Sequence, residues 1–242
     1  MGRMSHSPFT SFESYEKALS SAIFTLVSRV PLLKSRCVFH GSAAASISGL
    51  RHRMSWDADF MTERLMDDTA DIADQISTKF RGEMEWTQAD YESHMFQGRL
   101  HLDGLPDLPF DLFRNVHDLL PIKSATKRSL NGMPVVALET YAAEKAASIT
   151  ERSEQKDVYD ICACFRNPVA RADTKRSITR LGYSAVKTLQ RRTTDVGTSF
   201  ERFAPAIPGF DPVDAEIVEE FSTYLSLRRS QQELVRNARR TE

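Results

Sequence analysis

Two aspartates one residue apart are the strongest sign of chemistry in the chain. Asp57 and Asp59 lie in the segment 53–60, which reads Arg-Met-Ser-Trp-Asp-Ala-Asp-Phe. If residues 54–61 form a β-strand, both carboxylates leave one face of it about 6.6 Å apart, which is twice the rise per residue. Mg²⁺ binds hard oxygen ligands and commonly shares a substrate phosphate with the protein. The spacing therefore predicts a site for one or two divalent ions.

A glycine-serine pair upstream predicts an anion-binding turn. Residues 36–40 should form a short strand that leads into Gly41 and Ser42, and the alanine-rich residues 43–50 should form a helix with Ser42 near its N-cap. The first N–H groups of a helix have no partner within it, and the helix dipole is positive at that end. Gly41 and Ser42 are therefore candidates for binding a phosphate.

Three more polar residues could complete this region. Arg53 and Ser55 flank the acidic pair, and an arginine near a triphosphate would counter its charge. Asp111 lies in a predicted strand and points away from its apolar neighbours, so it could join Asp57 and Asp59 from an adjacent strand. It would then hold metal or accept the proton of an attacking hydroxyl. The alternative is an edge-strand acid that faces water.

A lysine further along the chain lies on the packed face of a predicted helix. Lys145 belongs to a stripe of residues at four-residue steps, and a buried ammonium needs an anionic partner such as a phosphate or a carboxylate. Alternatively its stem covers apolar surface while the amine reaches solvent. Asp157 and Asp160 share a face of the next predicted helix. Either could pair with Lys145, or with Arg152, as a structural ion pair.

Hydrophobic periodicity predicts an α+β protein of two lobes. Helices should cover residues 11–30, where Pro31 ends the first one, and 63–80; strands should cover 83–88, 91–102 and 109–113; residues 132–138 should be extended; and later helices should end near residues 152, 167, 192 and 240. This order gives an N-terminal lobe, residues 1–138, with a small mixed or antiparallel sheet flanked by helices. Residues 139–242 should form a C-terminal helical bundle.

Composition narrows the class of protein. The 242 residues are 41% hydrophobic and 27% charged, and they contain no apolar run near the roughly 18 residues that span a bilayer. We therefore expect a cytoplasmic protein without a membrane partner. The cysteines Cys37, Cys162 and Cys164 lack zinc-site spacing and should be reduced thiols.

The net charge of −1 argues against indiscriminate attraction to nucleic acid. Arginines gather near the end of the chain, where either a solvated helix face or RNA contact explains them: Arg228, Arg229, Arg236, Arg239 and Arg240. The sequence has no Walker loop, no Gly-x-Ser-x-Gly elbow and no His-Glu-x-x-His helix, so these ATPase and hydrolase classes have no support.

With these motifs in this order, the chain resembles the AbiEii/AbiGii-type (MenT-like) toxin nucleotidyltransferases, a group within the polymerase-beta-like nucleotidyltransferase superfamily. The matching stretches are the Gly41-Ser42 turn and residues 53–60, 144–152 and 156–160. They fall within residues 38–160, about half of the chain. Many members have Gly-Gly where this chain has Gly41-Ser42, and both pairs let the backbone approach a phosphate.

The resemblance implies a role for each candidate residue. It implies a nucleotidyltransferase-like N-terminal lobe, with Mg²⁺ or Mn²⁺ on Asp57 and Asp59 and with Asp111 as a third acid. It implies that NTP phosphates bind at Ser42 and Lys145. It also implies a catalytic or orienting acid at Asp157, although the pattern leaves Asp160 open as the functional acid.

The activity that the resemblance implies is attack of an RNA or protein hydroxyl on the α-phosphate of an NTP, with release of pyrophosphate. The leading acceptor is the 3′ end of tRNA. Such an enzyme acts as the toxin of an abortive-infection or phage-defence system, neutralised by a separately encoded antitoxin. Two alternatives stay open: a transferase that modifies a small molecule such as an aminoglycoside, and a non-catalytic module of the same fold that binds a nucleotide or a protein partner.

Overall fold

The computed structural model of the 242-residue chain describes residues 9–62, 67–114, 126–151, 154–198 and 215–238. The chain divides into two compact units, Ser7–Ala137 and Leu138–Glu242. Among the described residues, no helix combines the length and the apolar character that crossing a bilayer requires. The expected helix start at 63 and the helix ends near 152 and 240 lie outside the described residues.

A mixed β-sheet forms the centre of the unit Ser7–Ala137. Within the described residues its seven strands follow the order β3-β4-β5-β2-β1-β7-β6. The strands are β1 Cys37–His40, β2 Ala58–Thr62, β3 Met84–Asp90, β4 Met95–Leu100, β5 Leu108–Arg114, β6 Thr126–Leu130 and β7 Met133–Val136. β2 is parallel to β5 and β1 is parallel to β7, while the other neighbouring pairs are antiparallel.

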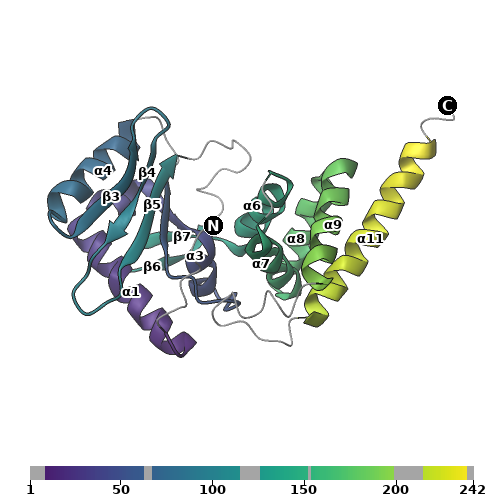
Figure 1. The fold of residues 1–242 in the computed structure, drawn as a ribbon, viewed down its shortest axis with the longest axis horizontal. Helices are drawn as coiled ribbons and strands as arrows, with labels where there is room; N and C mark the ends of the chain where they lie inside the picture. Colours follow the sequence, from purple (N-terminus) through teal and green to yellow (C-terminus); the bar gives the residue numbers. More distant parts are fainter. Residues whose placement is uncertain (1–8, 63–66, 115–125, 152–153, 199–214, 239–242) are drawn as a thin grey trace. The chain divides into compact units, whose positions relative to one another are not determined.

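Helices flank this sheet, and Figure 1 shows α1 and α4 alongside it. The helices of the unit are α1 Phe12–Arg29, α2 Pro31–Arg36, α3 Gly41–Ile47 and α4 Asp67–Lys79. Ser11 caps α1 by accepting the Ser14 N–H, and Leu19, Ile23 and Leu26 on its inner face are fully buried. Pro31 does end α1, but it also opens α2 at once, because proline suits the first turn of a helix.

Phenylalanines pack on one face of the sheet and show which of its two faces is buried. The ring of Phe60 on β2 lies 5.5 Å from that of Phe39 on β1 and 5.4 Å from that of Phe110 on β5. All three side chains are fully buried. Because side chains alternate along a strand, the residues next to them in sequence project from the opposite face. These residues include Asp59 and Asp111.

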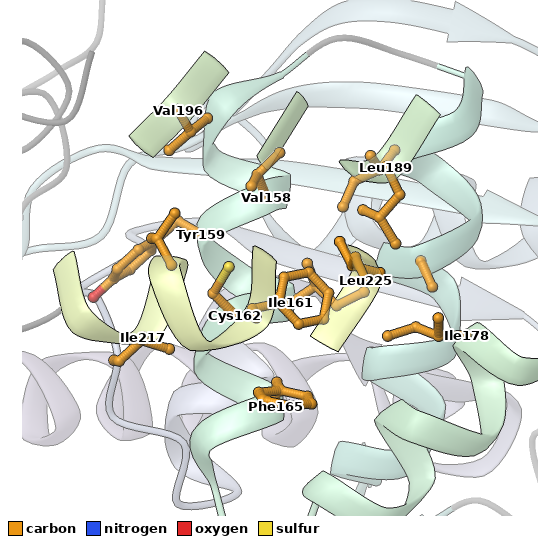
Figure 2. Close-up of a cluster of buried hydrophobic side chains, with 14 of the residues drawn as sticks. Val158, Tyr159, Ile161, Cys162, Phe165, Ile178, Leu189, Val196, Ile217 and Leu225 are labelled. Atoms are coloured by element: carbon orange, nitrogen blue, oxygen red, sulfur yellow. The ribbon is translucent and has the colours of Figure 1, made fainter. Parts of the chain in front are cut away.

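In the unit Leu138–Glu242, short turns join helices, and the described residues contain no strand. Its helices are α6 Leu138–Glu151, α7 Gln155–Arg166, α8 Arg171–Arg180, α9 Tyr183–Thr198 and α11 Ala215–Ala238. Side chains from several of these helices meet in one buried cluster (Figure 2), which includes Val158, Ile161, Phe165, Ile178, Leu189 and Leu225. The expected α+β class, with a mixed sheet followed by C-terminal helices, is therefore confirmed.

Several expected boundaries were wrong. The strand expected over 54–61 is β2, which begins only at Ala58. The helix expected over 43–50 begins at Gly41, so its N-cap is His40 and not Ser42. The long strand expected over 91–102 is β4, which begins at Met95.

Three elements of the described residues were not expected: α2, β6 and α8. Strand β6 pairs with β7 through a tight turn at Asn131 and Gly132, both of which have positive φ. In the helical unit, α8 was not expected, and the helix expected to end near 192 is α9, which continues to Thr198.

Candidate active site

A row of polar residues crosses the sheet on the face opposite the phenylalanines. The strand register places His40 of β1 opposite Asp59 of β2, and Asp59 opposite Asp111 of β5. Gln97 of β4 lies opposite Asp111, and its amide Nε2 donates a hydrogen bond of 3.2 Å to Asp111 Oδ2. The two aspartates thus come from neighbouring parallel strands at the same level. Of the two arrangements that the sequence left open for Asp111, the structure has the one on a strand next to that of Asp59, since β5 lies between β2 and β4.

The backbone of Gly41 approaches the carboxylate of Asp59 closely. A Cβ atom built on Gly41 would lie 2.0 Å from Asp59 Oδ2 and 3.0 Å from Asp59 Cγ, so no other residue fits without a shift. Gly41 also has φ +75°, in the left-handed region that favours glycine. The turn after β1 therefore reaches the acidic row directly, with no side chain between Gly41 and Asp59.

Hydrogen bonds connect the serine of this turn to Asp57. The guanidinium of Arg53 donates to Ser42 Oγ through Nη2 and to Ser55 Oγ through Nη1, the latter at 2.9 Å. Ser55 Oγ in turn donates to Asp57 Oδ2 at 3.0 Å. Ser42, Arg53 and Ser55 are all buried, with 3%, 9% and 8% exposure. Asp57 precedes β2, so these side-chain bonds, rather than the strand ladder, hold its carboxylate.

Tyr15 of α1 supports the same segment from its backbone side. Its hydroxyl donates to the carbonyl oxygen of Ser55 at 2.8 Å. Burial raises the pKa of Tyr15 well above its usual value, and the nearby charge of Asp57 raises it further. The hydroxyl therefore stays protonated and keeps its donor role at neutral pH.

The donor atoms around Asp57 fit a divalent cation. Asp57 Oδ1 is buried and has no hydrogen-bond partner among the described residues, an arrangement that is costly unless another group binds the atom. Carboxylate oxygens are the ligands that Mg²⁺ prefers. However, no three His, Cys, Asp or Glu side chains of the described residues gather into a group suited to a metal ion. The metal site of Asp57, Asp59 and Asp111 therefore stays a prediction.

Lys145 of α6 lies in a buried cluster with two acids of α7. Its Nζ is 2.6 Å from Asp157 Oδ1 and 2.8 Å from Asp160 Oδ2. Both aspartates are fully buried and Lys145 is 8% exposed. The sequence left open which acid would pair with this lysine, and both do; Arg152 lies outside the described residues. Burial raises the pKa of the neighbouring thiol of Cys164, and the charge of Asp160 adds to this effect.

The structure thus gathers the predicted residues into two groups, one in each unit. The sheet unit holds Gly41, Ser42, Arg53, Ser55, Asp57, Asp59 and Asp111, and the helical unit holds Lys145 and Asp157. Sequence reasoning missed His40, Gln97 and Tyr15. His40 had a usable signal, since it is the last residue of the predicted strand before the Gly41 turn. Gln97 and Tyr15 had none, because only the strand register and the packing of α1 bring them to the site.

Comparison with known proteins places this geometry in a family. The family model for the nucleotidyl transferase AbiEii toxin of type IV toxin–antitoxin systems matches residues 25–239. A search among curated proteins finds no match. The solved structure of JHP933 from Helicobacter pylori superposes with a TM-score of 0.54 at 13% identity and covers 96% of this chain and 98% of that one.

Two further solved structures have the same fold. A nucleotidyltransferase toxin of Mycobacterium tuberculosis H37Rv, MenT4, superposes with a TM-score of 0.53 at 18% identity and covers 88% of this chain and 84% of that one. An H. pylori protein described as a putative nucleotidyltransferase gives 0.53 at 14% identity and covers 93% and 98%. At these identities the likenesses concern the fold, whereas the family match spans most of the sequence. The chain belongs to the AbiEii family of nucleotidyltransferase toxins.

Proposed function

We propose that this nucleotidyltransferase is a metal-dependent toxin that transfers a nucleoside monophosphate from an NTP to RNA, with the 3′ end of tRNA as acceptor. The family description as a type IV toxin supports the toxin role and implies a cognate antitoxin as partner. We also propose that the units Ser7–Ala137 and Leu138–Glu242 are a nucleotidyltransferase lobe and a separate helical lobe.

The reaction is a displacement at phosphorus. The oxygen of the acceptor hydroxyl bonds to the α-phosphorus of the NTP, the bond from that phosphorus to the bridging oxygen breaks, and pyrophosphate leaves. The hydroxyl proton passes to a carboxylate, for which Asp111 and Asp157 are the candidates. Mg²⁺ or Mn²⁺, when bound, supplies positive charge next to the phosphate oxygens.

In the sheet unit we assign the metal ligands to Asp57, Asp59 and Asp111. One observation carries this assignment: Asp59 and Asp111 lie side by side in register while Gly41 packs directly against the Asp59 carboxylate. Because Gly41 has no side chain, the backbone of the predicted phosphate-binding turn lies next to an acid that would hold a cation. Ser42 follows Gly41 and is the phosphate-binding candidate of the turn.

In the helical unit we assign Lys145 to the nucleotide phosphates and Asp157 to a catalytic or orienting role. The resemblance of residues 144–152 and 156–160 supports these roles. Lys145 Nζ lies at ion-pair distance from both carboxylates, which compensate a positive charge in this buried position. An ammonium group is also a common phosphate ligand.

The test is transfer of label from α-³²P-labelled NTPs to total bacterial RNA, for the wild type, Asp57→Asn and Asp103→Asn. Asp103 is an exposed aspartate in the turn after β4 and is the matched control. We expect Mg²⁺-dependent labelling of tRNA by the wild type and the control. Asp57→Asn should reduce it by about 100-fold or more, as loss of a key electrostatic group does.

Two results would contradict the proposal. If the wild type transfers no label from any of the four NTPs to RNA, RNA is not the acceptor. If Asp57→Asn labels RNA as well as Asp103→Asn does, Asp57 holds no essential metal. Labelling of a small hydroxyl compound in place of RNA would move the enzyme to the antibiotic-modifying class.

A further inference from the structure

We propose that Arg53 is a positioning residue: it holds Asp57 ready for a divalent cation and ties that acid to the Gly41-Ser42 turn, and it does not bind the nucleotide phosphates itself. The inference rests on the proposed metal-dependent transfer and assigns a role within that site. It differs from the role in phosphate binding that the sequence suggests for Arg53. Its support comes from the hydrogen bonds that two nitrogens of the guanidinium donate.

The guanidinium of Arg53 reaches two serines on different segments. Nη2 donates to Ser42 Oγ on α3, and Nη1 donates to Ser55 Oγ at 2.9 Å. The backbone of Arg53 is attached to α3 as well, since Ser46 Oγ donates to its carbonyl oxygen at 2.9 Å. Arginine presents its donors in a rigid planar fork, so both serines are held in one fixed geometry.

Ser55 passes this constraint on to Asp57. A hydroxyl has one proton to donate and two lone pairs to accept with. Ser55 Oγ donates its proton to Asp57 Oδ2 at 3.0 Å, so it can only accept from Arg53 Nη1. The hydrogen bonds therefore run in one direction, from guanidinium to hydroxyl to carboxylate, and such chains reinforce each other.

The two carboxylate oxygens of Asp57 therefore differ in their hydrogen bonding. Oδ2 accepts from Ser55, while Oδ1 is buried without a hydrogen-bond partner among the described residues. Bonding of Oδ2 fixes the rotation of the carboxylate and hence the direction in which Oδ1 points. The atom left over is the one that suits a cation, and outer partners of this kind orient a ligand for its metal.

The surroundings of Arg53 differ from those of a second arginine on the same segment. Arg53 is 9% exposed. Arg51, two residues earlier, is different: its side chain is 61% exposed and its Nη2 lies 2.6 Å from Glu16 Oε2 at the surface. The two arginines share a segment and a side-chain chemistry, and only Arg53 contacts the serines that lead to Asp57. Arg51 is therefore the matched control.

The experiment compares wild type, Arg53→Met, Arg53→Lys and Arg51→Met in the full-length protein. Isothermal titration calorimetry measures binding of Mn²⁺ in the presence of a non-hydrolysable α,β-methylene NTP analogue. A parallel assay measures the Mg²⁺ concentration that gives half-maximal transfer and the KM for NTP at saturating Mg²⁺. Thermal unfolding without metal checks that each variant is folded.

We expect Arg53→Met to weaken metal binding by about 10- to 100-fold, the range found for outer partners of metal ligands. The Mg²⁺ requirement should rise by a similar factor, while the KM for NTP at saturating Mg²⁺ changes little. Arg53→Lys keeps the charge but loses the fork, so it should fall between Arg53→Met and the wild type. Arg51→Met should match the wild type.

Each other outcome overturns the inference. Metal binding by Arg53→Met equal to that of Arg51→Met removes the positioning role. A raised KM for NTP with unchanged metal affinity makes Arg53 a phosphate ligand instead. If both Arg53 variants fail to fold, Ser55→Ala breaks the same connection, and wild-type metal affinity in that variant also removes the role.

The two proposals fail separately. If the wild type binds no metal with the NTP analogue, the metal-dependent function fails and the role of Arg53 fails with it. If the wild type binds metal and transfers label while Arg53→Met behaves like it, only the role of Arg53 fails.

Discussion

Replacing Gly41 with alanine tests how closely the turn must approach Asp59. The added methyl group would lie 2.0 Å from Asp59 Oδ2, which is inside any real contact distance, so the carboxylate or the turn must move. This crowding is one energetic cost, and a second cost does not depend on Asp59. Gly41 has φ +75°, where a residue with a Cβ atom is strained.

A second glycine in the same unit, Gly104, separates the cost of backbone strain from the cost of crowding at Asp59. Gly104 has φ +74°, and a Cβ built on it meets nothing within 4 Å. Gly104→Ala therefore carries only the backbone strain, roughly 1–2 kcal/mol for a left-handed residue. Gly41→Ala carries that strain plus the crowding at Asp59, which adds about 1–3 kcal/mol as overpacking does. We expect a total loss of about 2–5 kcal/mol for Gly41→Ala.

Tryptophan fluorescence during urea unfolding is a suitable assay. Both tryptophans of the chain, Trp56 and Trp86, lie in the unit that contains Gly41. The signal therefore reports the free energy of unfolding of that unit. The double variant Gly41→Ala/Asp59→Gly removes the side chain that the methyl group meets. In a double-mutant cycle, this variant should regain the part of the unfolding free energy that is lost to crowding, while the part lost to backbone strain remains.

The cycle also separates stability from function. The double variant should be more stable than Gly41→Ala and yet inactive in transfer, because the acid is gone. If Gly41→Ala is no more destabilising than Gly104→Ala, or if removing Asp59 brings no recovery, then the turn does not pack against this carboxylate. The assignment of the nucleotide site to this turn would then lose its main structural support.

Two more predictions concern the helical unit. Lys145→Met should destabilise this unit by about 3–5 kcal/mol, because it leaves the buried Asp157 and Asp160 without their cation. The control is Glu220→Gln, which breaks the exposed Arg171–Glu220 pair and should change stability by less than about 1 kcal/mol. Far-UV circular dichroism during thermal unfolding measures both, and equal effects would mean that the cluster is not buried. The raised pKa of Cys164 favours its neutral form in the fold, so its contribution to stability is complete below the unfolded thiol pKa of about 8.5 and is lost as pH rises further. Cys164→Ala should flatten the fall in unfolding temperature between pH 8 and 10, and an unchanged slope would contradict this.

The alternation of side chains in sequence predicted that Asp59 and Asp111 point away from their apolar neighbours, but it predicted neither that their strands are adjacent nor the limits of β2. An apolar-polar alternation continues through residues 54–57, yet a strand exists only where a neighbour pairs with it. β1 turns into α3 after His40, which pairs with Asp59, and pairing with β5 begins at Ala58. Asp57 is therefore outside the ladder, and no property of residues 54–57 alone could reveal this.

The other differences between the expected and the observed structure are of two kinds: local sequence signals that were missed, and contacts that form only in the folded chain. The dipeptide Asn131-Gly132 is the strongest short-range signal for a hairpin, and it does join β6 to β7, so this strand could have been predicted. Likewise Asp90 Oδ1 accepts the N–H groups of Glu92 and Ser93, a local turn that delays β4 to Met95. The contacts of Arg53 are of the second kind, because they join segments that only the folded chain brings together.

Asp57 and Asp59 are held in place by different contacts. Asp59 lies in β2, where hydrogen bonds to both neighbouring strands fix its backbone and Gly41 borders its carboxylate. Asp57 has no ladder and depends on Ser55, and through it on Arg53. Both supports lead to the first turn of α3, which carries Gly41 and Ser42. The placement of this one turn therefore sets the positions of both acids, and a change in it should disturb metal and nucleotide binding together.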